Sequence, residues 1–132
     1  MEFRKILNML TQKLSKNYPK RGEIFIADLN PGYGREMHKK RPVLVISNNV
    51  LNQNLSTVVM IPLSSIIPEF IGPDVVKVAE KIGLDKDSVI IVNQIRSIDQ
   101  ARLIKRVGIL SRDKIEQVEE ALQITLGMTN LD

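Results

Sequence analysis

The densest group of charged side chains in this sequence lies within residues 30–41, where a phosphate group could be held. Residues 35–41 contain four cations, one carboxylate and the only histidine of the chain: Arg35, Glu36, His38, Lys39, Lys40 and Arg41. Planar guanidinium groups match phosphate oxygens in pairs, and ammonium groups add point charge. The segment is therefore interpreted either as a phosphate-binding loop or as a highly charged surface turn in solvent.

Arg41 differs from its neighbours because it directly precedes Pro42 and a run of apolar residues. A residue before proline is restricted to extended backbone conformations. We therefore expect the guanidinium group of Arg41 to be held in place at the entrance of a strand, whereas the other cations of the segment extend from a loop.

Several kinds of chemistry are excluded or disfavoured by what the sequence lacks. The absence of cysteine excludes disulfides, thiolate nucleophiles and iron–sulfur clusters. With one histidine and no carboxylates at ligand spacing, we expect no metal, and without GxxxxGK[ST] or GxGxxG we expect no nucleotide cofactor. No apolar run approaches the roughly 18 residues of a membrane span. We expect a soluble cytoplasmic protein that does not bind membranes.

The hydrophobic pattern predicts the framework that positions these side chains. It is typical of short strands, expected at residues 23–29, 42–47, 57–63, 75–79, 88–95 and 102–109. The unbroken apolar run at 42–47 indicates burial on both faces. The asparagine-rich residues 48–54 and the proline-containing residues 64–73 are expected to be connections, the second a long surface loop.

Helices are expected at both ends of the chain. Ser111 can cap a C-terminal helix that ends near Gly127. Residues 1–20 are expected to form an amphipathic helical extension to a domain of residues 21–132, with an apolar stripe at Phe3, Ile6, Leu7, Leu10 and Leu14. This helix would pack on the domain or on a partner subunit, the alternative being a membrane-surface or nucleic-acid arm. The pattern favours a mainly β, α+β fold with an antiparallel, partly closed barrel.

Several spaced motifs in this order resemble those of the MazF/PemK (Kid) family of toxin endoribonucleases. They are Arg21-Gly22-Glu23-Ile24, Asn30-Pro31 with Gly34 and Glu36, Arg41 to Ile46, Thr57 to Ser64, Gly83 to Val89, and Gln94-Ile95-Arg96-Ser97-Ile98-Asp99. The resemblance covers residues 21 to 128 and does not include the N-terminal extension.

The resemblance implies an SH3-like, CcdB-like barrel that forms a homodimer and cleaves single-stranded RNA at a short sequence without a metal. The ribose 2′-OH would attack in line, leaving a 2′,3′-cyclic phosphate and a 5′-OH. By position, the catalytic arginine of the family falls on Arg41, its catalytic threonine on Ser64 and its loop glutamate on Glu36. The expected partner is an acidic, MazE-like antitoxin protein.

Side-chain chemistry matches these three residues to parts of the reaction. Cleavage needs charge neutralisation on a pentacoordinate phosphorane, an acceptor for the 2′ proton and a donor to the leaving 5′ oxygen. Arg41 suits the first role, and it could act as an acid only through a charged hydrogen bond because a guanidinium stays protonated. Glu36 is either a base or an orienter of Arg41, or it forms a salt bridge with Arg35 or Lys39. Ser64 either donates to a non-bridging oxygen or simply ends a strand.

The other candidates would bind RNA without cutting it. The cationic and polar candidates are Arg35, His38, Lys39, Lys40 and Arg96. One branch of the family has an Arg-x-Asp pair where this chain has Ile91 and Asn93, so Arg96 is interpreted as a phosphate-binding or interface residue. Tyr33 and Phe70 are candidates for stacking on bases, or for simple packing.

Two alternatives to the endoribonuclease remain at the level of sequence. The first is a non-catalytic CcdB-like poison of DNA gyrase, which would not need the Arg41 and Ser64 pair. The second is a decayed homologue that binds RNA without cutting it, favoured if serine at position 64 is disabling.

Overall fold

The computed structural model describes residues 2–6, 17–79 and 82–129. At the N-terminus, residues 3–6 are helical, and the amide of Ile6 donates to the carbonyl oxygen of Glu2 at 3.1 Å. The expected stripe residues Leu7, Leu10 and Leu14 lie outside the described residues. No helix in the described ranges combines the length and the hydropathy of a membrane span.

The described residues form one antiparallel sheet of seven strands, which confirms the mainly β fold. The strands are β1 Glu23–Asp28, β2 Lys40–Val45, β3 Thr57–Ser64, β4 Val75–Val78, β5 Ser88–Ile91, β6 Arg96–Asp99 and β7 Leu103–Ile109. Their order is β4-β5-β3-β2-β1-β7, and β6 pairs with β3 off this path. Within the described part, no pairing joins β7 back to β4, so the sheet is not closed into a barrel.

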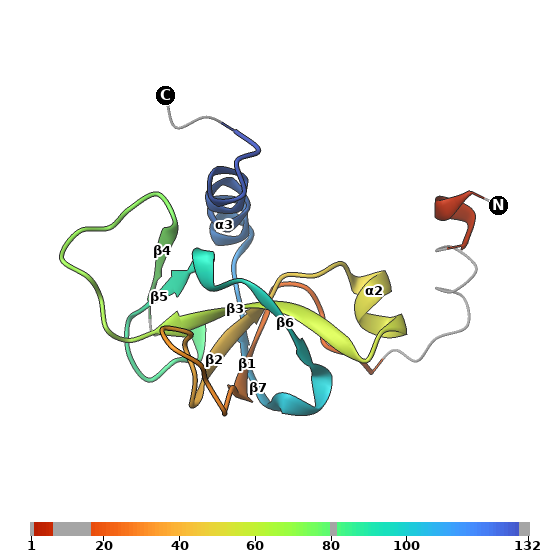
Figure 1. Ribbon diagram of the computed structural model, residues 1–132, viewed down its shortest axis with the longest axis horizontal. Helices are drawn as coiled ribbons and strands as arrows, with labels where there is room; N and C mark the ends of the chain where they lie inside the picture. The colour runs from red at the N-terminus through yellow and green to blue at the C-terminus, as the bar shows by residue number, and fades with distance from the viewer. Residues whose placement is uncertain (1, 7–16, 80–81, 130–132) are drawn as a thin grey trace.

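Strand β3 is the element around which the sheet is organised. Its last residues pair with β5 and its first residues pair with β6, while its middle pairs with β2. Figure 1 shows β3 running across the molecule between α2 (Asn49–Asn54) and the loop that leads to β4. This loop follows Ser64 and carries mostly exposed side chains, as expected for residues 64–73.

The core lies on both faces of the central strands. Leu44 packs in a cluster with Val118 and Ala121 of the C-terminal helix, whereas Val43 and Val45 belong to a second cluster on the other side. Burial on both faces is therefore confirmed for this run. Strand β2 nevertheless begins earlier than expected, at Lys40, because Lys40 and Arg41 pair with Asp28 and Ala27 of β1.

The prediction that residues 48–54 form only a connection is wrong, because residues 49–54 form the short helix α2. The side chain of Asn48 accepts a hydrogen bond from the amide of Val50 at 2.8 Å and caps this helix. Asn52 is buried, and its side-chain amide donates to the carbonyl oxygen of Ser47 at 3.0 Å. Asparagine, a residue that favours both turns and N-caps, serves here as a cap and a buried bridge.

The prediction of one strand over residues 88–95 is also wrong. Strand β5 ends at Ile91, the 3₁₀ turn η2 spans Val92–Gln94, and β6 follows as a separate strand. The amide of Val92 still donates to the carbonyl oxygen of Asp74 at 3.0 Å, in register with the pairing to β4, and the amide of Ile95 then donates to the carbonyl oxygen of Val92 at 3.1 Å and closes the turn. A second 3₁₀ turn, η3 Gln100–Arg102, then precedes β7, which starts one residue later than expected.

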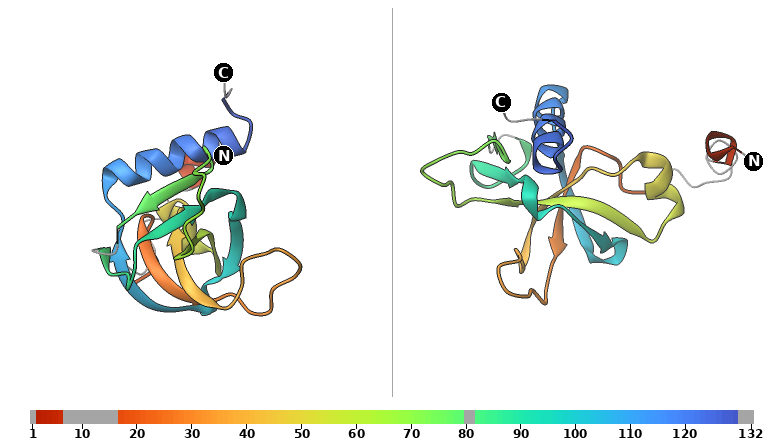
Figure 2. Two further views of the ribbon diagram at one scale, coloured as in Figure 1. Left: turned by 90° about the vertical axis from the view of Figure 1, so that its left-hand side faces the viewer. Right: turned by 45° about the horizontal axis from the view of Figure 1, so that its top comes forward.

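The C-terminal helix α3, Arg112–Thr125, is confirmed with both of its expected ends. The side chain of Ser111 accepts from the amide of Lys114, and Gly127 has a positive φ of 72°. Figure 2 shows α3 lying across one face of the sheet. Its buried residues Val118 and Ala121 complete the larger of the two core clusters.

Two glycines bring the turn before β5 into close contact with β7. A Cβ atom on Gly108 would lie 1.9 Å from the carbonyl oxygen of Ile82, and one on Gly83 would lie 1.9 Å from that of Val107. Gly83 also has a φ of +96°, a conformation that side chains disfavour. The backbones can therefore touch only because both positions lack side chains.

We predict that Gly108→Ala lowers the free energy of unfolding by about 1–3 kcal/mol, because the added methyl group would overlap a backbone carbonyl group. Ile109→Val, a change on an exposed neighbour in the same strand, is the control and should be nearly neutral. Urea denaturation of the two variants measures the difference. Equal free energies of unfolding for the two variants would contradict the prediction, because they would show that the turn and β7 can move apart without loss of stability.

Candidate active site

Arg41 is fixed in its place by two backbone oxygens. It lies in β2, where its Nε donates to the carbonyl oxygen of His38 at 2.7 Å and its Nη1 donates to that of Leu63 at 3.4 Å. One acceptor belongs to the loop between β1 and β2, and the other belongs to β3. No described residue accepts a hydrogen bond from Nη2, so this corner of the guanidinium group remains available to a ligand.

The side chain of Arg41 is also partly shielded from water. Burial lowers the pKa of its guanidinium group from the usual value, because desolvation disfavours the charged form. An arginine nevertheless stays protonated at neutral pH. Its charge therefore acts through a medium of lower polarity than water, in which an anion is attracted more strongly.

Ser64 and Arg41 line the same cleft. This cleft has a volume of about 360 Å³ and is lined by Ile26, Lys40, Arg41, Pro42, Leu63, Ser64, Ser65, Leu84, Asp85, Lys86 and Ser88. The Oγ of Ser64 accepts a hydrogen bond from the amide of Ile66 at 3.1 Å. The structure thus brings together three of the predicted site residues, Arg41, Ser64 and Lys40, and adds Lys86, which sequence reasoning did not select.

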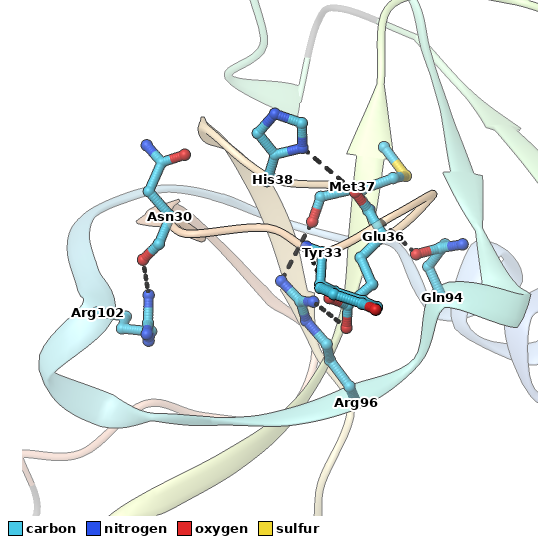
Figure 3. A network of polar contacts seen from close by, with 8 residues as sticks. All are labelled: Asn30, Tyr33, Glu36, Met37, His38, Gln94, Arg96 and Arg102. Carbon is cyan, nitrogen blue, oxygen red and sulfur yellow. Dashed lines mark hydrogen bonds and ion pairs between the residues drawn. The ribbon is translucent and has the colours of Figure 1, made fainter.

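Glu36 does not line this cleft and does not touch Arg41. Its Oε2 pairs with Nη1 of Arg96 at 3.2 Å, and its Oε1 accepts from the amide of Tyr33 at 2.9 Å (Figure 3). The sequence offered Arg35 or Lys39 as the salt-bridge partner, and the structure places Arg96 there. Glu36 and Arg96 instead line a separate cleft of about 460 Å³ beside Leu29, Ser97 and Arg102.

The ion pair between Glu36 and Arg96 is one of several contacts that hold the loop between β1 and β2. Arg96 also donates from Nη2 to the carbonyl oxygen of Met37 at 3.1 Å, and the side chain of Gln94 accepts from the amide of Met37 at 3.2 Å. Arg102 donates to the carbonyl oxygens of Asp28 and Asn30 at the start of the loop. These tethers hold the loop that carries the carbonyl group of His38.

Gln94 and Arg102 are therefore site residues that sequence reasoning missed. Both belong to 3₁₀ turns that flank β6, and their partners lie 57 and 72–74 positions away in the chain. No local pattern connects residues at such separations. The one sequence signal for Gln94 is that it begins the family motif of residues 94–99.

The remaining candidates lie in loops, apart from Lys40, the first residue of β2. Nδ1 of His38 lies 3.3 Å from the carbonyl oxygen of Glu36, and Arg35, Lys39 and Lys40 are exposed. The rings of Tyr33 and Phe70 are 86% and 82% exposed. Contact of these residues with RNA stays a prediction. Among the described residues, no three His, Asp or Glu side chains are grouped as a metal would require.

The fold is a small antiparallel β domain with a cleft that places a fixed guanidinium group beside a hydroxyl. Comparison with known proteins identifies the family: PemK-like, MazF-like toxins of type II toxin–antitoxin systems match residues 20–126. The chain belongs to this family. It is 39% identical over 114 residues to the endoribonuclease MazF of Staphylococcus epidermidis, covering 86% of this chain and 95% of that protein.

Solved structures share the fold. The crystal structure of MazF from Deinococcus radiodurans matches with a TM-score of 0.76 at 24% identity, over 86% of this chain and 100% of that chain. An endoribonuclease from a mycobacterial species, solved in complex with its cognate antitoxin, matches with a TM-score of 0.69 at 23% identity, over 85% and 98% of the two chains.

We predict that Arg96→Ala loosens the loop while leaving the domain folded. An exposed or half-exposed ion pair contributes about 1 kcal/mol or less to stability. Arg96, however, also donates a hydrogen bond to the carbonyl oxygen of Met37, which the substitution removes as well. Amide hydrogen exchange should accelerate at Tyr33 and Met37 and remain unchanged in β3. Arg112→Ala, which removes a more exposed ion pair on α3, is the matched control. Unchanged exchange at both loop amides would refute the role of Arg96 as a tether.

Proposed function

We propose that this toxin is an endoribonuclease that cuts single-stranded RNA at a short sequence without a metal. The observation that carries the proposal is the guanidinium group of Arg41, held by two carbonyl oxygens in a positively charged cleft beside the hydroxyl of Ser64. The ribose 2′-OH attacks the adjacent phosphorus in line. The bond to the 5′ oxygen breaks, which leaves a 2′,3′-cyclic phosphate and a 5′-OH.

Arg41 stabilises the phosphorane in this proposal. The pentacoordinate intermediate has more negative charge on its non-bridging oxygens than the diester has, so a fixed cation lowers its energy more than that of the substrate. Because Nε is engaged by the carbonyl group of His38, the Nη2 corner faces the phosphate. Such a group needs no reorganisation during the reaction, which is what makes electrostatic stabilisation effective.

Ser64 donates the second hydrogen bond. Its Oγ already accepts from the amide of Ile66, and a hydroxyl has one proton to donate. The amide thus fixes the oxygen and leaves the proton for a non-bridging phosphate oxygen. Serine keeps the hydroxyl that threonine would supply and lacks only the methyl group that restricts χ1.

Glu36 positions the loop and does not touch the reacting atoms. Its carboxylate is engaged by Arg96 and by the amide of Tyr33, and through these contacts it holds the loop that carries the carbonyl group of His38. Arg35 and Lys39 on the same loop and Lys40 at the start of β2 bind flanking phosphates, and Tyr33 and Phe70 stack on bases.

The protein works as a homodimer in the cytoplasm, where mRNA is found, and is held inactive by an acidic antitoxin. The mycobacterial relative was solved with its cognate antitoxin, and a relative from Deinococcus radiodurans was solved as a MazE–MazF complex. An acidic chain would lie across the cations of residues 35–41 and exclude RNA by charge and by bulk.

We predict that Arg41→Ala lowers the single-turnover rate of RNA cleavage in chelator by at least about 10², because a preorganised charged donor is lost. Lys114→Ala removes a cation of α3 that does not line the cleft, and this variant should cut at the wild-type rate. The cleaved ends are mapped on a long single-stranded RNA. Cleavage that survives Arg41→Ala would contradict the mechanism, and inhibition of gyrase supercoiling with intact RNA would favour a gyrase poison.

Two substitutions, each of which changes one group of the serine side chain, test the role of Ser64. Ser64→Ala removes the donor and should lower the rate by about 10²–10³, whereas Ser64→Thr keeps it and should cut at least as fast as the wild type. The same mapped RNA serves as the substrate for both. If the wild type only binds RNA and Ser64→Thr alone cuts it, the natural chain is a decayed enzyme.

A further inference from the structure

The cleft at Arg41 and Ser64 continues into a second hollow. This hollow has a volume of about 250 Å³ and is lined by Ile26, Pro42, Gly83, Leu84, Asp85, Lys105 and Val107. Four of these residues, Ile26, Pro42, Leu84 and Asp85, also line the first cleft. The two hollows therefore form one groove that runs from Ser64, at the end of β3, to Lys105 on β7.

The register of the sheet explains the direction of this groove. Ile26 of β1 pairs with Pro42 of β2 on one side and with Lys105 of β7 on the other. Residues directly opposite each other in an antiparallel sheet present side chains on the same face. The three residues thus form a row across three strands, about 10 Å wide, with an apolar floor of Ile26 and Pro42.

The wall of the groove is the turn that precedes β5. This turn is held against β7 by the close backbone contact at Gly83 and Gly108. Leu84 and Asp85 of the turn then face the row, and Lys86 lines the end nearest to Ser64. The groove is consequently a built feature of the fold, with a floor from the sheet and a wall fixed by the backbone.

Cations lie at both ends of this groove. Lys40, Arg41 and Lys86 line the end at Ser64, and Lys105 lines the other end, whereas Asp85 is the one carboxylate among the residues that line it. None of these four cations forms an ion pair with a described residue. Such a spacing of positive charge along an apolar floor complements a chain of phosphates joined by riboses that carry bases.

We propose that Lys105 holds a phosphate of the RNA strand outside the scissile linkage, with the intervening ribose or base lying over Ile26 and Pro42. The assignment rests on the proposed function, because the strand is the one whose scissile phosphate lies at Arg41. The continuity of the groove with that site favours RNA over an acidic peptide as the occupant. Lys105 is a substrate-binding residue and takes no part in the bond-breaking step.

The test measures binding without turnover. The probe is a short single-stranded RNA of random sequence in which every ribose carries a 2′-O-methyl group, so that no 2′ attack can occur. Its affinity is measured against salt concentration for the wild type, Lys105→Ala and the control Lys114→Ala, which removes a half-buried cation of α3 outside the groove. Loss of one phosphate contact should reduce the slope of log affinity against log salt by about 0.7. Lys114→Ala should keep the wild-type slope.

The outcomes separate this assignment from the proposed function. If the wild type does not cleave RNA but Lys105→Ala still flattens the slope, the cleavage chemistry fails and the assignment of Lys105 stands. If the wild type cleaves RNA and Lys105→Ala binds the probe like Lys114→Ala, the assignment of Lys105 is overturned and the chemistry stands. An effect of Lys105→Ala on binding of a polyglutamate peptide, without any effect on RNA, would also overturn it.

Discussion

The hydrogen bond from Nε of Arg41 to the carbonyl oxygen of His38 is the contact on which the rest of the site depends. It joins the start of β2 to the loop that precedes it, so the direction of the guanidinium group is set by the backbone. The adjacent Pro42 restricts Arg41 to an extended conformation. One side chain is thereby fixed between a strand and a loop, and its Nη2 corner is not bonded to any described residue.

The position of that carbonyl group depends in turn on residues far away in the chain. Gln94, Arg96 and Arg102, which come from β6 and its flanking turns, all bind the loop between β1 and β2. Each contact is worth little by itself, since exposed polar contacts contribute about 1 kcal/mol or less. Together, however, they fix the conformation of the loop, because they hold it at its start and at Met37.

Local patterns predicted the framework and the central residue of the site. Apolar runs located β1, β2 and β3, the cap at Ser111 located α3, and the position of Arg41 before Pro42 singled it out. The division of residues 88–99 into β5 and β6 was missed because only Asn93 and Gln94 separate Val92 from Ile95, and the break is a 3₁₀ turn in which the amide of Ile95 donates to the carbonyl oxygen of Val92. The pairing of Glu36 with Arg96 is equally invisible locally, since 60 positions separate them.

The most direct test of this account is the single-turnover cleavage rate of Arg41→Lys in chelator. Lysine keeps the positive charge but lacks the rigid planar fork in which one nitrogen bonds the carbonyl oxygen of His38 while another is held toward the phosphate. If the fixed direction of the guanidinium group is what matters, the rate should fall by about 10² or more, as expected for loss of a preorganised donor. A rate within a few-fold of the wild type would show that charge alone suffices, and would contradict the account.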